Sequence, residues 1–150
     1  MLVWPFGAGK LEHITTFFRA FDEQIAVLGW LWEAVAGLGV AAWIPPGSDG
    51  AMLEIDRAIR PTLVGAETRH GEMWEWIAEH FPDEPFWYLD HIAVKAEHRG
   101  TGLGAALIQH GLAFADRDGV PAFLETGRPG NVAYYGRRGF RTVADDDAPG

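Results

Sequence analysis

The sequence predicts a single α/β domain whose helices flank a central sheet. Residues 86–94 are rich in aromatic and β-branched side chains, with only Asp90 and His91 as polar interruptions, which is typical of a central strand buried on both faces. A glycine-rich turn follows, and beyond it apolar side chains recur at helical spacing. With 150 residues, of which 48% are hydrophobic, the chain is long enough for one domain with a proper core and too short for two. We therefore expect residues 1–150 to form one domain around this strand.

The first expected elements are a helix and a hairpin. Residues 11–23 carry apolar side chains at helical spacing, which predicts a short amphipathic helix. Residues 25–44 contain Glu33 as their only charge and have the length of a membrane span, but glycines and a following Pro-Pro pair disfavour that interpretation. We expect two buried strands instead, over 25–34 and 40–44, joined by a turn.

Two helices are expected next, and they separate the hairpin from the central strand. The first covers about 51–59, and Ser48 and its neighbours can cap it. The second covers about 71–81 and ends before Pro82.

The segments after the central strand predict two helices and two strands. A helix is expected over 102–118, closed by the turn at 119–121, and a strand over 122–126. A loop of turn residues leads to a helix that Asn131 would cap and that would end with Gly139 as its C-cap. Residues 140–143 are expected to form the last strand.

Composition limits the partners. The chain has 12 basic and 21 acidic residues, a formal net charge of −9, which argues against nucleic acid and would steer a basic substrate such as an amine favourably. Without cysteine it can form neither disulfides nor thiolate zinc sites, and its histidines show no metal-ligand spacing, so no metal is expected. The N-terminus shows no signal peptide, and we expect a cytoplasmic protein without a membrane partner.

The glycine-rich turn between strand and helix predicts an anion site. The first amides of a helix lack internal partners, the helix dipole is positive there, and glycine lets the backbone approach a phosphate closely. A P-loop would need a lysine after Gly104, and none is present. A dinucleotide fingerprint, as in an NAD-binding oxidoreductase, would start directly after the strand, whereas here the glycines stand at 100, 102 and 104, well beyond Val94.

The third kind of anion site fits the spacing. The motif Arg99-x-x-Gly102-x-Gly104, after a strand ending Ile92-Ala93-Val94, resembles the acyl-CoA loop of the GNAT N-acetyltransferase superfamily. Downstream, Phe123-Leu124-Glu125-Thr126 looks like the next strand of that fold, and Asn131-x-x-x-Tyr135-x-x-x-Gly139-Phe140 looks like its C-terminal helix and following strand.

The resemblance covers roughly residues 11–143, and the segments 43–47 and 120–126 look most like the puromycin N-acetyltransferase branch. It implies a mixed, mostly antiparallel sheet flanked by helices. The usual first strand and helix before residue 11, and the usual last strand after residue 150, are expected to be missing. The edge at 140–143 would then be unpaired and could form a homodimer.

The resemblance also implies a function. The chain would be an acetyl-CoA-dependent N-acetyltransferase that moves an acetyl group to a primary amine of a small molecule, by direct attack in a ternary complex. The alternative is a non-catalytic acyl-CoA-binding or interaction module with a truncated GNAT fold. Backbone groups of Ile92 and Val94 would hold the pantetheine arm, and Arg99 with the amides after it would bind the pyrophosphate. The expected acetyl-CoA-binding residues are Ile92, Ala93, Val94, Arg99, Gly100, Thr101, Gly102, Leu103, Gly104, Ala105 and Asn131.

Three side chains are candidates for proton transfer. Tyr135 would protonate the departing thiolate as general acid, and the spacing to Gly139 favours it over Tyr134. Glu125, at the end of its strand, is the first candidate for the base that deprotonates the amine. Asp90 is the second, because strict alternation would place it on the same face of its strand as Ile92, with His91 on the opposite face.

Overall fold

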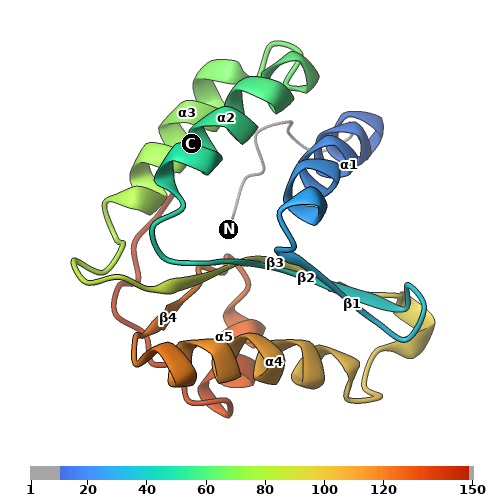
Figure 1. Cartoon of the computed structure of the whole chain (residues 1–150), viewed down its shortest axis with the longest axis vertical. Coiled ribbons are helices and arrows are strands. Elements are labelled where there is room, and N and C mark those ends of the chain that lie inside the picture. The colour runs from blue at the N-terminus through green and yellow to red at the C-terminus, as the bar shows by residue number, and fades with distance from the viewer. Residues whose placement is uncertain (1–10, 149–150) are drawn as a thin grey trace.

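The structure is a computed structural model, and it describes residues 11–148 of the chain. Figure 1 shows three layers, with α1, α2 and α3 on one face of a four-stranded sheet and α4 and α5 on the other. The helices are α1 (Leu11–Val27), α2 (Asp49–Ile59), α3 (Glu67–Ala78), α4 (Leu103–Asp118) and α5 (Pro129–Gly136), with single 3-10 turns at Arg60–Thr62 and Ala96–His98. The strands are β1 (Leu31–Ala34), β2 (Gly39–Ile44), β3 (Trp87–Val94) and β4 (Ala122–Phe123), hydrogen-bonded in that order. Only β3 and β4 pair in parallel, so the expected mixed, mostly antiparallel sheet is confirmed.

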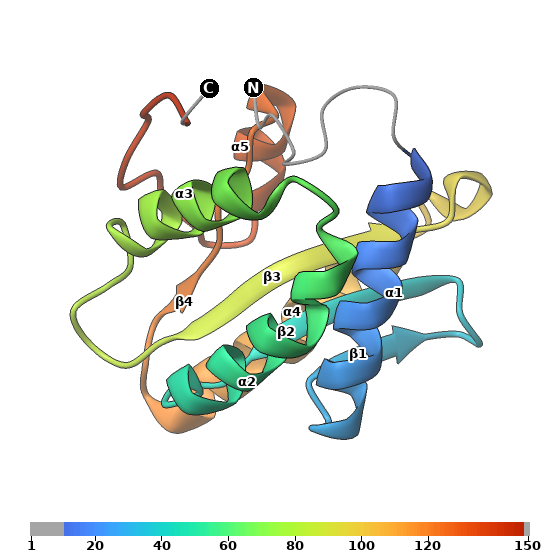
Figure 2. The same cartoon turned by 90° about the horizontal axis from the view of Figure 1, so that it is seen from above.

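Strand β3 pairs with β4 over a short stretch only. Trp87 lies opposite Ala122 and Tyr88 opposite Phe123, and the expected strand over 122–126 ends there. Because β3 continues to Val94, most of its length on this side has no strand partner among the described residues. The sheet therefore opens into a gap between the two strands, as Figure 2 shows from above.

The register of β2 and β3 is interrupted at Asp90. Ala42 lies opposite His91 and Trp43 opposite Leu89, so Asp90 is an extra residue, a β-bulge, without a partner on β2. Alternation fails at a bulge, and Asp90 hydrogen-bonds to His91 on the α1 side, whereas Ile92 packs on the α4 side. The prediction that Asp90 shares a face with Ile92 was wrong for this reason.

The first helix is longer than predicted. Residues 25–27 belong to α1, and strand β1 begins only at Leu31, so the predicted strand over 25–34 was wrong in its first half. Ile25 is fully buried and continues the stripe of Phe17 and Phe21 at helical spacing, a pattern that a short apolar run conceals. In the part of the chain that the structure describes, no helix is long and apolar enough to cross a membrane.

Helix α4 is fixed to the sheet by a contact that only glycine permits. Trp43 on β2 is fully buried, and its indole nitrogen donates a hydrogen bond to the carbonyl of Leu107 at 3.2 Å. A Cβ on Gly111 would lie 1.9 Å from the indole ring, so the helix can approach the ring only without a side chain there. This contact places the N-terminus of α4 beside the open end of β3.

Two helices differ from the prediction at their boundaries. Helix α3 starts and ends earlier than the predicted 71–81. The N-cap of α5 is Arg128, because Pro129 suits the first helical position, so Asn131 lies inside the helix and is not its cap. Its C-cap is Arg137 rather than Gly139, although Gly139 adopts a left-handed backbone with φ of +93°.

The predicted last strand is absent. Residues 140–143 form no strand, and Phe140 packs its ring against Tyr135 at 5.9 Å instead. The edge strand of the described sheet on this side is β4, so the free edge expected at 140–143 was wrong.

Candidate functional site

A groove of about 460 Å³ lies where the end of β3, the glycine-rich loop, the N-terminus of α4 and helix α5 meet. The predicted residues that line it are Ile92, Val94, Arg99, Gly100, Gly102, Gly104, Ala105, Asn131 and Tyr135. The structure thus brings together residues from three segments that are distant in the sequence. Ala93, Thr101, Leu103, Asp90 and Glu125 do not line this groove.

The glycines of the loop serve two purposes. Gly100 and Gly102 adopt left-handed backbones, with φ of +77° and +91°, which L side chains rarely adopt. Gly104 allows a close approach, because a Cβ there would lie 2.8 Å from the hydroxyl of Tyr134. Thr101 closes the turn, with its hydroxyl donating to the carbonyl of His98 at 2.6 Å.

The N-terminus of α4 is open toward the groove. Gly102 is its N-cap and has no side chain that could satisfy the first amides. The first intrahelical bond runs from the Ala106 amide to the Gly102 carbonyl at 2.9 Å, so the amides before Ala106 have no intrahelical acceptor. These amides and the positive end of the helix dipole favour an anionic group here.

The edge of β3 also offers free backbone groups. The amide of Lys95 donates to the carbonyl of Leu38, next to β2, at 2.9 Å. Because backbone groups alternate in direction along a strand, those of Ala93 also face β2, whereas those of Ile92 and Val94 face the gap left by β4. An extended ligand with amide groups could hydrogen-bond to these backbone groups as an added strand would.

Tyr135 reaches the groove from α5. Its side chain is buried, and its hydroxyl has no hydrogen-bond partner among the described residues. Burial raises the pKa of Tyr135, with smaller contributions from Tyr134 and Glu125, whereas the charge of Arg138 lowers it. The phenol is therefore protonated at neutral pH and able to donate a proton. Tyr134 lines the same groove, so proximity does not separate the two tyrosines.

Asn131 ties α5 to the segment after β4. Its amide nitrogen donates to the hydroxyl of Thr126 at 3.1 Å, which leaves the carbonyl oxygen of the side chain free for another contact. This bond sets the position of α5 across the groove.

Glu125 lies on the other side of the sheet, against Tyr88. The buried Tyr88 hydroxyl is 2.9 and 3.0 Å from the two carboxylate oxygens of Glu125. Burial, and then the charge of Asp90, raise the pKa of Glu125 to about 8, although the Tyr88 hydroxyl lowers it. A carboxyl group with this pKa can exchange a proton near neutral pH.

His91 lies between two carboxylates. Its Nδ1 is 2.9 Å from Asp90 on its own strand, and its Nε2 is 3.0 Å from Asp22 on α1, where the angle is that of an ion pair rather than of a well-directed hydrogen bond. Burial lowers the pKa of His91, but the two carboxylates outweigh it and raise the pKa to about 9. The rings of Phe18 and Phe21 flank the imidazole, so an imidazolium is held in an apolar setting between α1 and β3.

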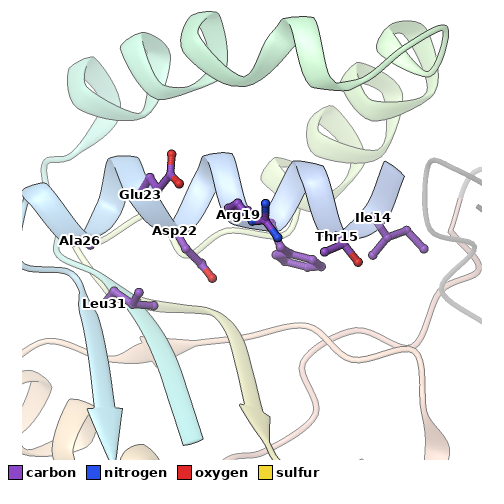
Figure 3. Close-up of a pocket in the computed structure, with 8 residues that line it drawn as sticks. Ile14, Thr15, Arg19, Asp22, Glu23, Ala26 and Leu31 are labelled. Atoms are coloured by element: carbon purple, nitrogen blue, oxygen red, sulfur yellow. The ribbon is translucent and has the colours of Figure 1, made fainter. Parts of the chain in front are cut away.

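A second groove, of about 590 Å³, follows one side of α1. Figure 3 shows Asp22 pointing from α1 toward the strands beside Leu31, and Asp22 lines this groove together with Arg19 and Glu23. It is the larger of the two grooves, but it is a shallow, mostly apolar furrow between α1 and the first residue of β1, and no glycine lines it. The smaller groove is therefore the better candidate for the functional site.

Sequence reasoning missed three of the residues described above. His98 and Arg138 line the smaller groove, and Asp22 pairs with His91 from α1. Arg138 follows Tyr134 by one helical turn, which is a weak signal, and nothing in the sequence indicates the pairing of Asp22 with His91. Within residues 11–148, no cluster of three or more His, Asp or Glu side chains could hold a metal ion.

Comparisons with known proteins show the family. A family model described as the acetyltransferase (GNAT) family matches residues 12–140. A crystal structure described as "histone acetyltransferase HPA2 and related acetyltransferase", from Corynebacterium glutamicum, is 26% identical with a TM-score of 0.57, over 93% of this chain and 70% of that one. A putative acetyl transferase from Pyrococcus furiosus is 19% identical with a TM-score of 0.40, over 73% of this chain and 99% of that one. Another acetyltransferase structure is 22% identical with a TM-score of 0.47, over 91% and 74% of the two chains.

Proposed function

Because the chain belongs to the GNAT acetyltransferase family, we propose that it transfers an acetyl group from acetyl-CoA to a primary amine of a small molecule, by direct attack in a ternary complex. The observation that carries the proposal is the groove in which the open N-terminus of α4, the free edge of β3 and Tyr135 meet. Both layers of the core pack on β3, which supports one domain over residues 1–150.

The groove suits the donor in two parts. The diphosphate of acetyl-CoA would lie on the amides of Leu103, Gly104 and Ala105, beside Arg99. The pantetheine arm would follow the gap in the sheet and pair with backbone groups of Ile92 and Val94. Asn131 lines the same groove and is suited to the amides of the arm.

The transfer removes two protons from the nitrogen of the protonated amine and supplies one to the sulfur of CoA. The amine nitrogen attacks the thioester carbonyl carbon, the carbon–sulfur bond breaks, and the sulfur leaves as a thiolate. Tyr135 would donate its phenolic proton to that thiolate. One proton of the protonated amine would go to a carboxylate on the α1 side of the sheet before the attack. The second proton, which the nitrogen loses as the amide forms, would return to the Tyr135 phenolate.

Glu125 is the better base of the two candidate carboxylates. Its pKa of about 8 is close to the working pH, so it can accept a proton and release it again. Asp90 is instead held by the His91 imidazolium and contributes its charge, which raises the pKa of Glu125. In this proposal Asp90 attracts the ammonium and Glu125 takes its proton, so two carboxylates have two roles set by their surroundings.

An acetylation assay with a panel of amines should test several classes of acceptor. Residues 43–47 and 120–126 resemble the puromycin N-acetyltransferase branch, so puromycin is the first amine to try. A lysine-containing histone peptide belongs in the same panel, because the similar Corynebacterium protein is described as a histone acetyltransferase.

Calorimetric titration with acetyl-CoA, with NAD as a parallel ligand, tests the donor site. We expect acetyl-CoA to bind with a Kd in the micromolar range and NAD not to bind. Gly102→Glu should abolish binding, since it strains a left-handed backbone and places a negative charge at the groove.

Gly119→Glu is the matched control. Gly119 is left-handed too, with φ of +67°, but it is the C-cap at the far end of α4. Equal loss of binding in both variants, or no binding by the folded wild-type chain, would contradict the proposed donor site.

A further inference from the structure

Arg138 is held rigidly at the groove by its neighbour Tyr134. The guanidinium carbon of Arg138 lies 3.5 Å from the centre of the Tyr134 ring, a cation–π contact. Its Nη1 also donates to the Tyr134 carbonyl at 2.6 Å. A long side chain that usually moves freely in water is thus fixed along α5, and little of its conformational entropy remains to be lost on binding a ligand.

Arg138 has no carboxylate partner among the residues described. Among the described residues, three arginines away from the groove pair with acids: Arg57 with Glu54, Arg60 with Asp56 and Arg117 with Asp118. Among the described residues, the Nε atom of Arg138 is buried without a hydrogen-bond partner, and the carbonyl of Tyr134 is the one acceptor to which its guanidinium donates. Because Arg138 is half-buried, lines the groove and has no acid beside it among the described residues, its charge is available to an anion from outside the chain.

The guanidinium faces the same cavity as the free amides of α4. The Tyr134 hydroxyl lies where a side chain on Gly104 would begin, so the stacked pair of Tyr134 and Arg138 closes against the glycine-rich loop. Arg138, just after α5, and Gly102, the N-cap of α4, line one groove from different segments. An anionic group at the helix N-terminus would therefore have a fixed cation on its other side.

We propose that Arg138 is a second anion-binding residue of the donor site, which contacts the diphosphate of acetyl-CoA from the segment after α5 while the first amides of α4 bind it from the loop. This inference rests on the proposed function and deepens it, because it makes donor affinity depend on the diphosphate. A planar guanidinium matches the two oxygens of a phosphate, whereas the exposed Arg99 must be ordered on binding.

The test compares two neighbouring arginines. Arg137 is exposed, does not line the groove and carries the same charge, so Arg137→Gln is the matched control for Arg138→Gln. Calorimetry with acetyl-CoA should show a Kd about 10-fold higher in Arg138→Gln and a Kd within about 2-fold of wild type in Arg137→Gln. The Kd for dephospho-CoA, which keeps the diphosphate and lacks the 3′-phosphate, should rise by the same factor in Arg138→Gln.

Three outcomes would overturn the inference. They are an unchanged Kd in Arg138→Gln, equal losses in both glutamine variants, and a loss confined to acetyl-CoA, which would assign Arg138 to the 3′-phosphate. Should Arg138→Gln unfold, Arg138→Lys keeps the charge without the planar guanidinium, and we expect a Kd between those of wild type and the glutamine variant. A folded wild-type chain that binds neither ligand would overturn the proposed function itself, which no result on the variants alone can do.

Discussion

The two sides of the sheet at β3 differ in charge. On the side of α1, Asp90 and Asp22 enclose the His91 imidazolium, and Glu125 lies near them. On the side of α4 and α5, Arg138 lines a groove that no acid enters among the residues described, next to the open end of a helix. The net charge of −9 therefore agrees with the acidic side of the sheet and not with the side of α4 and α5. An anionic donor and a cationic acceptor could each meet a complementary surface and come together across a gap in one sheet.

The largest effect is expected from removing the base. Glu125→Gln should lower kcat by about 100- to 1000-fold, because the attacking amine then keeps its proton, while the Kd for acetyl-CoA stays the same. In wild type, kcat/KM should rise with pH through about 8, and the variant should lack this rise. A pH-rate profile of both proteins is the measurement. Loss of the rise in Asp90→Asn, and not in Glu125→Gln, would exchange the two assignments.

Glu125→Gln should also stabilise the protein at high pH. The folded state holds the Glu125 proton up to a pKa of about 8, whereas the unfolded chain releases it near 4.5. Stability is therefore lost as pH rises from 4.5 through 8, and a neutral glutamine avoids that loss. Thermal melts at pH 9 should show a higher Tm for Glu125→Gln than for wild type.

Tyr135, the proposed general acid, lies on the α4 and α5 side of the sheet and is tested by removing its hydroxyl. Tyr135→Phe should lower kcat by about 100-fold, since the thiolate must leave without a proton, and should leave the Kd for acetyl-CoA unchanged. Tyr134→Phe is the control, because Tyr134 lines the same groove and also carries a phenol. If Tyr134→Phe causes the larger loss, the family spacing has selected the wrong tyrosine.

The sequence predicted what depends on local pattern. The strand at 86–94, the glycine-rich turn and the helix after it follow from side chains a few residues apart, and the structure confirms all three. The glycines were expected to let the backbone approach a phosphate, whereas the left-handed backbone at Gly102 and the close approach of the Tyr134 hydroxyl to Gly104 were not predicted. Eight of the eleven residues predicted to bind acetyl-CoA line one groove.

The rest depends on contacts that a single sequence does not encode locally. The bulge at Asp90 is a property of the register between β2 and β3, and it reversed the expected face of Asp90. The pairing of His91 with Asp22 requires α1 to lie across β3, and the end of α1 at Val27 rather than residue 23 was missed because Ile25 reads equally well as a strand residue. Arg138 was missed because its role comes from the stack on Tyr134.

The pairing of His91 with Asp22 and Asp90 beneath α1 should make the stability of the protein depend on pH. The folded-state pKa of His91 is about 9 and its ordinary value is 6.5, so its contribution is complete below pH 6.5 and is lost as pH rises through 9. His91→Gln should lower the free energy of unfolding by about 3 kcal/mol at pH 6, and the difference should shrink by pH 10. Urea denaturation at both pH values measures it. His80→Gln is the control, because the partner of His80, Asp146, is exposed, and we expect a much smaller change.

The smallest expected effect is the change of the Kd for acetyl-CoA with salt. Its sign shows whether the charges at the groove or the net charge of the protein dominate binding. Acetyl-CoA and the protein are both negative, so repulsion between them would weaken as salt screens it, and binding would tighten. If the cations and helix amides of the groove dominate, salt screens an attraction, and the Kd should rise by about 3-fold between 50 and 500 mM NaCl. We expect the second result, since Arg99 and Arg138 lie at the groove while the acids paired with His91 lie on the other side of the sheet. The rise should be smaller in Arg138→Gln and unchanged in Arg137→Gln, and a Kd that falls with salt would show that net charge outweighs the local surface.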